Sequence, residues 1–219
     1  GQLFMISTST YLNDNQKDQL AELIKDYHPG GLLITRGGPR SHAKLVNKLQ
    51  KRSPLPMLVG MNAGSGLGQA LDSTLSFQKP MLVGAIQNEQ LIFELGEEIA
   101  REMRVLGVHV NFAPNADFEI HQQPYPNSLD YYSDNYNRVR NKSLAFVNGL
   151  QQGGVLVCAR HLFHTEKITT QKNQDASLFI NLNIDTLKVS VLNQLSKAGV
   201  DGILTSNLHF LKNTDENNS

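Results

Sequence analysis

The densest group of side chains able to do chemistry follows a short apolar run at residues 155–159. It consists of Arg160, His161, His164 and Glu166. A cation and two imidazoles at one strand end can bind a polar substrate or move a proton. The alternative is that the two histidines lie in an ordinary loop and only bond backbone groups. The residue types alone do not decide between these interpretations.

Two histidines and a glutamate so close together also raise the question of a metal ion. Their spacing does not follow a helix, and no distant third ligand accompanies them. Glycines at 37–38 and 64–68 can expose backbone N–H groups to an anion, but neither stretch matches a nucleotide-binding fingerprint. Glycine turns at strand ends are common without any ligand. We therefore predict no metal site, no nucleotide and no cofactor.

A polar loop in the middle of the chain is rich in aromatic residues. It holds Tyr125, Tyr131, Tyr132 and Tyr136 together with two prolines. The faces of such rings can stack on a sugar, and they can equally pack the loop against the rest of the domain. The sequence leaves both interpretations open.

The elements that must position these residues follow one repeated pattern, in which a helix-periodic segment leads through glycine into a short apolar run. The pattern is typical of βα alternation in a parallel sheet. The predicted helices cover residues 20–27, 43–49, 91–106, 139–150 and 185–198. The predicted strands cover residues 32–35, 57–60, 108–112, 155–159 and 203–206.

Strands that are apolar on both faces must be covered on both faces. That requirement fits a doubly wound open sheet or a (β/α)8 barrel, and the pattern does not choose between them. In both architectures ligands bind beyond the carboxyl ends of the strands. The residues at those ends are Arg36, Asn62, 115–117, 160–164 and 207–209.

Composition narrows the class of partner. Twenty basic and twenty acidic residues cancel in the 219-residue chain, so no global field favours nucleic acid or an anionic membrane surface. The single cysteine, Cys158, cannot form an internal disulfide. No stretch has the roughly 18 apolar residues of a membrane span, and residues 1–7 lack the features of a signal peptide. A leader trimmed before Gly1 is compatible with this start.

Several sequence blocks, in order and spacing, resemble the catalytic barrel domain of glycoside hydrolase family 3, of the β-N-acetylglucosaminidase type. The blocks are residues 1–5, 30–34, 37–39, 71–77, 84–86, 98–102, 106–107, 110–114 with Asp117, and 198–200. The resemblance covers essentially the whole chain and implies a TIM-type (β/α)8 barrel. It also implies retaining hydrolysis of β-linked sugars through an aspartate nucleophile, often with a histidine as acid/base.

Within that resemblance, five positions are implied to bind substrate. Asn62 stands where the family has an aspartate that grips sugar hydroxyls, and Asn127 stands near the position of a family arginine. Asp117, Arg160 and His161 complete the implied set. An amide in place of a carboxylate weakens hydrogen bonds to a sugar, because bonds to ionised groups are about twice as strong as neutral ones.

The implied catalytic positions depart further from the family pattern. The Lys-His-Phe-Pro-Gly-His-Gly signature becomes residues 160–165, in which His164 matches the second histidine. The family's Asp-Ser-His stretch becomes residues 174–177, which keep Asp175 but have no histidine to carry a proton. The family's nucleophile motif lies beyond residues 198–200, and none appears before Ser219.

The sequence thus predicts an α/β barrel domain over residues 1–210, with about five βα units of eight, and a polar tail over 211–219. A second copy, an additional domain or a rearranged sheet is expected to cover the open barrel. The family resemblance implies a location in the bacterial periplasm or cell envelope, and a cytoplasmic location is the alternative.

For function the sequence favours a degenerate, catalytically impaired family 3 domain that retains a carbohydrate-binding or structural role. The alternative is part of an active retaining β-N-acetylglucosaminidase whose nucleophile comes from outside this segment. A third reading is unrelated chemistry centred on Arg160, His161 and His164, which a bound anion would favour.

Overall fold

A six-stranded parallel sheet organises the chain. The computed structural model describes residues 1–116, 129–160, 191 and 193–205. The strands are β1 (Met5–Ser9), β2 (Gly31–Arg36), β3 (Leu58–Met61), β4 (Val110–Asn111), β5 (Leu156–Arg160) and β6 (Gly202–Leu204). Neighbouring strands pair in the order in which they occur along the chain. A doubly wound sheet reverses its order at a switch point, whereas this sheet does not, so its order is that of a barrel.

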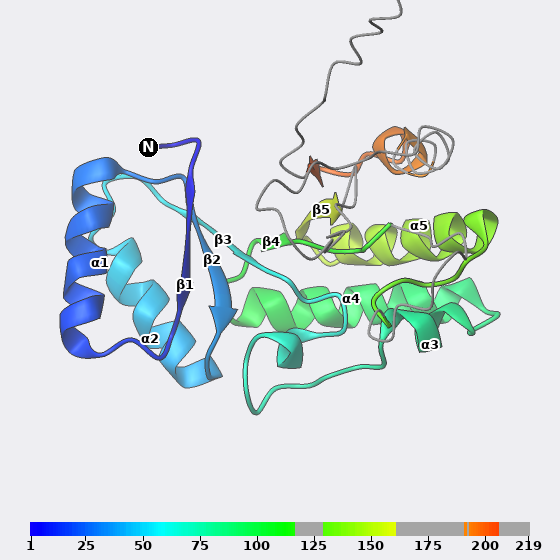
Figure 1. The fold of residues 1–219 in the computed structure, drawn as a ribbon, viewed down its shortest axis with the longest axis horizontal. Helices are drawn as coiled ribbons and strands as arrows, with labels where there is room; N and C mark the ends of the chain where they lie inside the picture. The colour runs from blue at the N-terminus through cyan, green and yellow to red at the C-terminus, as the bar shows by residue number, and fades with distance from the viewer. Residues whose placement is uncertain (117–128, 161–190, 192, 206–219) are drawn as a thin grey trace, which may run out of the picture.

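Helices connect the strands, as the alternating pattern predicted (Figure 1). They are α1 (Asp14–Tyr27), α2 (Pro39–Gln50), α3 (Pro80–Gly84), α4 (Glu89–Val105) and α5 (Tyr136–Gln152), with a 3-10 turn, η1 (Leu67–Gln69). Residues 193–197 are also helical and precede β6. Most of the predicted fifth helix and the tail at 211–219 lie outside the described residues.

The prediction of five strands was one short, because it omitted β1. This strand pairs with β2 in register, Met5 opposite Gly31 and Thr8 opposite Ile34. Its sequence, Met-Ile-Ser-Thr-Ser, has too few apolar residues to resemble a buried strand. None of its five residues is fully buried, as expected for a strand at the edge of the described sheet.

Local capping explains where the helices begin. Asn13 precedes α1, and its side chain accepts from the Gln16 backbone N–H at 2.9 Å, while the Gln16 side chain accepts from the Asn13 backbone N–H at 3.0 Å. Helix α2 begins at Pro39, earlier than the periodicity predicted, because proline is well suited to the first helical position. The side chains of Asn88 and Asn135 cap α4 and α5 by accepting from the backbone N–H groups of Gln90 and Arg138.

The two faces of the strands differ in burial. Alternate residues of β2, β3 and β5 are fully buried: Leu32, Ile34, Val59, Met61, Val157 and Ala159. Other side chains of the same strands are more accessible, and Leu58 is 46% and Leu156 42% exposed. In the described part of the chain, one face of the sheet is therefore sealed, and the other still exposes apolar surface.

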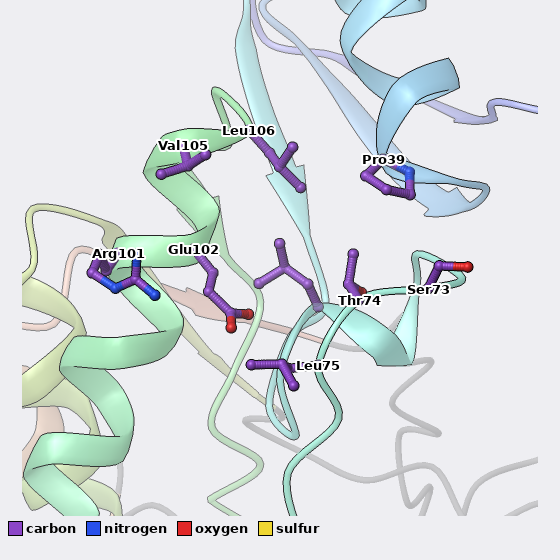
Figure 2. Close-up of a pocket in the computed structure, with 9 residues that line it drawn as sticks. Pro39, Ser73, Thr74, Leu75, Arg101, Glu102, Val105 and Leu106 are labelled. Carbon is purple, nitrogen blue, oxygen red and sulfur yellow. The ribbon is translucent and has the colours of Figure 1, made fainter.

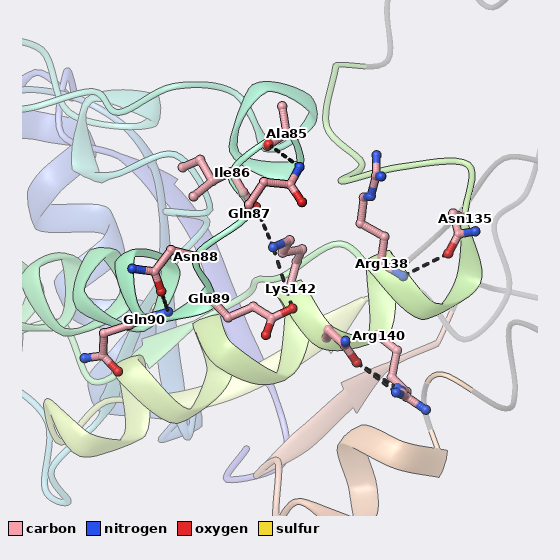
Figure 3. A network of polar contacts seen from close by, with 11 residues as sticks. Ala85, Ile86, Gln87, Asn88, Glu89, Gln90, Asn135, Arg138, Arg140 and Lys142 are labelled. Atoms are coloured by element: carbon pink, nitrogen blue, oxygen red, sulfur yellow. Dashed lines mark hydrogen bonds and ion pairs between the residues drawn. The ribbon is translucent and has the colours of Figure 1, made fainter.

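Helices α4 and α5 form the tightest helix pair because glycines let their backbones meet. A Cβ atom added to Gly149 would lie 2.0 Å from the Phe93 carbonyl oxygen, and one on Gly96 would lie 2.6 Å from that of Phe146. Beside this contact, Lys142 reaches across from α5 with a side chain only 5% exposed. Its Nζ donates to the Ile86 carbonyl at 2.5 Å and lies 3.7 Å from Glu89 Oε1 (Figure 3).

A buried histidine joins α2 to the end of α4. His42 is fully buried, and its Nε2 lies 3.0 Å from the Leu106 carbonyl oxygen, which requires the proton on Nε2. Burial lowers the pKa of His42 below its ordinary value of 6.5 and outweighs the opposing effect of the Leu106 hydrogen bond. The folded protein therefore keeps this imidazole neutral at pH values where the unfolded chain takes up a proton.

This histidine gives a first prediction. Burial places the pKa of His42 lower in the folded protein than in the unfolded chain. The contribution of neutral His42 to the free energy of unfolding is therefore complete above pH 6.5, and it is lost as the pH falls from there toward the folded pKa. His42→Gln keeps an N–H donor for Leu106 and has no titrating group. The free energy of unfolding of this variant should therefore fall less steeply as the pH is lowered. Urea unfolding of both proteins across this pH range measures the two slopes. Equal slopes would assign the pH dependence to other groups.

Candidate active site

The structure brings together two of the predicted site residues, Asn62 and Arg160. Asn62 directly follows β3 and Arg160 ends β5, so both lie at the carboxyl edge of the sheet. With the amide oxygen turned toward the guanidinium, Asn62 Oδ1 accepts from Nη1 at 3.1 Å and from Nη2 at 3.2 Å. Both terminal nitrogens of the Arg160 guanidinium thus donate to one neutral amide oxygen.

This pair lines a cavity of about 430 Å³. The other lining residues are Leu33, Ile34, Thr35, Gln69, Ala70, Phe112 and Leu204. None of these described lining residues is an aspartate or glutamate. The cavity therefore combines one cation, two amides and a hydroxyl with apolar walls, a composition that suits a neutral polar ligand.

A buried asparagine fixes the segment that carries Asn62. Asn111, in β4, is fully buried, and its Oδ1 accepts from the Ala63 backbone N–H at 3.0 Å. Its Nδ2 faces the Ala63 carbonyl oxygen at 3.4 Å. Two residues further on, the Ser65 N–H donates to the Gln69 side chain at 3.2 Å, which turns the loop back toward the cavity. Asn111 was not among the predicted site residues, although a polar residue inside an apolar run signals a buried hydrogen bond.

The backbone after β4 fixes Arg160. The Arg160 N–H donates to the Pro114 carbonyl at 3.0 Å, and the Ala116 N–H donates to the Arg160 carbonyl at 2.7 Å. An adjoining small hollow is lined by Asn115, Asp130 and Tyr132 together with Arg160. Asp130 lies 3.4 Å from Lys79 Nζ in an ion pair at the rim.

The other candidate positions separate into two groups. Arg36 is exposed at the end of β2, and the Gly37 backbone bonds Ala70 and Asp72, which makes this glycine stretch part of an internal turn. Tyr132 is 4% exposed and packs into the core, and burial raises the pKa of its hydroxyl. Asp117, Asn127, His161, His164 and Asp175 lie outside the described residues, as do Glu166 and Tyr125.

Two properties of the described residues bear on ligands and membranes. Across 1–116, 129–160 and 191–205, leaving out residue 192, no three His, Cys, Asp or Glu side chains gather as a metal site would require. Among the helices in those ranges, none has the length and apolar character needed to cross a membrane.

A parallel sheet in barrel order, with a polar pair in a cavity at its carboxyl edge, defines a domain of the β/α barrel class. Comparison with known families gives the particular class: the model of the glycosyl hydrolase family 3 N-terminal domain matches residues 1–218. The chain belongs to this family, which confirms the resemblance seen in the sequence blocks.

Curated relatives include two β-hexosaminidases. The chain is 26% identical over 156 residues to β-hexosaminidase A of Pseudoalteromonas piscicida, an alignment that covers 65% of this chain and 26% of that protein. It is 25% identical over 170 residues to β-hexosaminidase of Thiobacillus denitrificans, covering 74% of this chain and 46% of that protein. The chain thus matches less than half the length of each relative.

Solved structures confirm the fold. A family 3 β-N-acetylglucosaminidase from Paenibacillus superposes with a TM-score of 0.74 at 24% identity, over 96% of this chain and 41% of that one. NagZ from Neisseria gonorrhoeae, in complex with N-trifluoroacetyl-D-glucosamine, superposes with a TM-score of 0.73 at 15% identity, over 96% and 64%. The described six strands therefore belong to the family's TIM-type barrel.

Proposed function

We propose that this domain binds a carbohydrate of the β-linked N-acetylglucosamine type and does not hydrolyse it. The observation that carries the proposal is the Asn62–Arg160 pair in a cavity whose described lining residues include no carboxylate. Retaining glycosidases need two carboxyl groups, or a carboxylate and another acid/base, on either side of the scissile bond. A neutral amide and a guanidinium can hold a sugar but cannot attack its anomeric carbon.

Each part of the cavity has a role in this proposal. The Arg160 guanidinium donates to sugar oxygens, and Asn62 and Gln69 offer amide donors and acceptors to hydroxyl groups. Phe112 presents an aromatic surface to the apolar face of a sugar ring. Because none of these groups is negatively charged, the bonds to sugar hydroxyls are weaker than those of a carboxylate.

A second candidate function is part of an active retaining β-N-acetylglucosaminidase. This second function is favoured by the length of the curated relatives, of which the chain matches 26% and 46%. In a longer protein, other residues would supply the nucleophile. In that case the Asn62–Arg160 pair would still bind the substrate, and only the source of the reacting groups would differ. The two functions therefore share the binding step and separate at turnover.

Titration with N-acetylglucosamine tests the shared binding step. Calorimetry is expected to show saturable binding that Arg160→Ala weakens roughly tenfold, because hydrogen bonds from a charged group are lost. Asn62→Asp is expected to tighten binding by about the same factor, since an ionised acceptor replaces a neutral one.

A matched control is Arg52→Ala, which removes an exposed arginine between α2 and β3, at the opposite end of the strands. This variant should bind the sugar as the unaltered protein does. Absence of binding, or an Arg160→Ala variant that binds as well as Arg52→Ala, would contradict a sugar site at the carboxyl edge.

A further inference from the structure

Two cavities of about 430 Å³ each differ in the charged groups among their described lining residues. One lies between the start of α2, the C-terminal half of α4 and the segment that follows η1 (Figure 2). It carries both a guanidinium and a carboxylate, from Arg101 and Glu102. The other is the sugar cavity around Asn62 and Arg160, whose described lining residues include a guanidinium and no carboxylate. The hydrogen bonds within the sugar cavity determine which ligand atoms its polar groups can receive.

The oxygen atoms of the two amides in the sugar cavity already accept hydrogen bonds from the protein. Asn62 Oδ1 accepts from both terminal nitrogens of Arg160, at 3.1 and 3.2 Å. Gln69 Oε1 accepts from the Ser65 backbone N–H at 3.2 Å. No hydrogen bond among the described residues uses either amide nitrogen. The groups that the two amides offer to a ligand are therefore mainly N–H donors, two on each nitrogen.

A ligand can reach both amides. Gln69 is exposed, Asn62 is half-buried, and both line the cavity. Gly64 lies between them in the sequence, and a Cβ atom added to it would be 3.9 Å from Gln69 Oε1. The same Cβ would be 3.9 Å from the Asn62 amide atom that does not contact Arg160. The two amides are therefore near neighbours, and one small group of a ligand can contact both.

The acceptors of the cavity are neutral. Thr35 Oγ1 donates its proton to the Thr8 carbonyl at 3.1 Å, so only its lone pairs are left for a ligand. A described carboxylate, Asp130, lines the adjoining hollow and forms an ion pair with Lys79 Nζ at 3.4 Å. Among the described side chains that line the sugar cavity, donors therefore outnumber acceptors, and no acceptor is ionised.

We propose that the sugar bound in this cavity carries a carboxylate, as a uronic acid does. The carboxylate oxygens accept from Asn62 Nδ2 and Gln69 Nε2, and a ring hydroxyl donates to Thr35 Oγ1. Hydrogen bonds to an ionised acceptor are about twice as strong as neutral ones, so a ligand that brings its own carboxylate gains most from these donors. The inference rests on the proposed sugar binding and names the acidic group that the otherwise neutral, polar sugar bears.

Calorimetric titration of the full chain at neutral pH compares three methyl β-glycosides. They are the glycosides of N-acetylglucosamine, of the corresponding uronic acid, in which carbon 6 is a carboxylate, and of the uronamide, in which it is a neutral amide. The uronic acid is expected to bind roughly tenfold more tightly than N-acetylglucosamine. The uronamide has the same shape but replaces one acceptor oxygen with a donor, so it should lose this advantage.

Two variants exchange the donors for acceptors and keep the internal bonds. Asn62→Asp retains an acceptor for Arg160, and Gln69→Glu retains one for the Ser65 N–H. Each should weaken binding of the uronic acid roughly tenfold and tighten binding of N-acetylglucosamine, which reverses the preference. The matched control is Gln152→Glu, the same chemical change at the exposed end of α5, near the amino ends of the strands. It should leave both affinities unchanged.

Three results would overturn the inference. If the uronic acid and N-acetylglucosamine bound equally well, sugar binding would stand and a role for the carboxylate would be excluded. If Asn62→Asp and Gln69→Glu kept the preference for the uronic acid, as Gln152→Glu should, the carboxylate would bind elsewhere. If none of the three glycosides bound, the proposed function itself would be wrong, and this inference with it.

Discussion

Replacing Gly149 with alanine is expected to lower the free energy of unfolding by roughly 3 kcal/mol. The new Cβ would meet the Phe93 carbonyl oxygen at 2.0 Å and the Glu97 backbone nitrogen at 3.0 Å, both on α4. Because these are backbone atoms, α4 and α5 would have to move apart, which would also loosen the packing around Phe146. Alanine's better helix propensity, about 1 kcal/mol, offsets only part of this cost.

Urea unfolding measures this change. The matched control is Asn148→Ala, which adds no atom and alters the neighbouring, exposed position on the same helix. Its free energy of unfolding should stay within about 0.5 kcal/mol of the unaltered value. If Gly149→Ala were as stable as Asn148→Ala, the close approach of α4 and α5 would not be a feature of the protein in solution.

Replacing Asn111 with alanine is expected to cost roughly 2–3 kcal/mol and to impair the sugar cavity. The substitution removes the acceptor for the Ala63 N–H at 3.0 Å and leaves that buried group without its partner. Ala63 is itself fully buried, so water does not readily replace the lost bond. Since Ala63 follows Asn62 directly, the amide that receives Arg160 loses its support.

Urea unfolding and N-acetylglucosamine titration, made on the same samples, distinguish the two effects. Asn47→Ala makes the same chemical change at an exposed position of α2 and should alter neither quantity appreciably. Asn111 is a positioning residue in this account, so the folded Asn111→Ala protein should bind the sugar more weakly. Unchanged sugar affinity in that variant would show that Asn62 is held in place by other contacts.

Most of the sheet could be predicted because its central strands are apolar runs that follow glycine or, at β3, proline. The runs at β2, β3 and β5 are buried on alternate residues in the structure, as their Val, Leu and Ile content indicated. Strand β1 could not be recognised in this way, since its last three residues are serine, threonine and serine and an edge strand needs fewer apolar side chains. To distinguish a barrel from a doubly wound sheet, one must know the order in which the strands pair. That order depends on contacts between residues far apart in the sequence.

Part of the candidate site followed from one rule, that parallel strands gather their carboxyl ends at one edge. The rule put Asn62 and Arg160, which are far apart in sequence, at the same edge of the sheet, and in the structure their side chains meet there. It did not identify Gln69 or Phe112 as cavity residues, because a loop residue's direction depends on contacts such as that between Ser65 and Gln69. The family blocks supplied the sugar chemistry, which the residue types alone left open.

The most direct measurement is hydrolysis of a chromogenic β-N-acetylglucosaminide by the 219-residue chain, with Asn62→Asp and His161→Ala variants in parallel. The account predicts no turnover by the unaltered chain and none by Asn62→Asp, because restoring an acceptor for sugar hydroxyls supplies no nucleophile. Turnover by the unaltered chain that His161→Ala abolishes would contradict it and establish a working glycosidase.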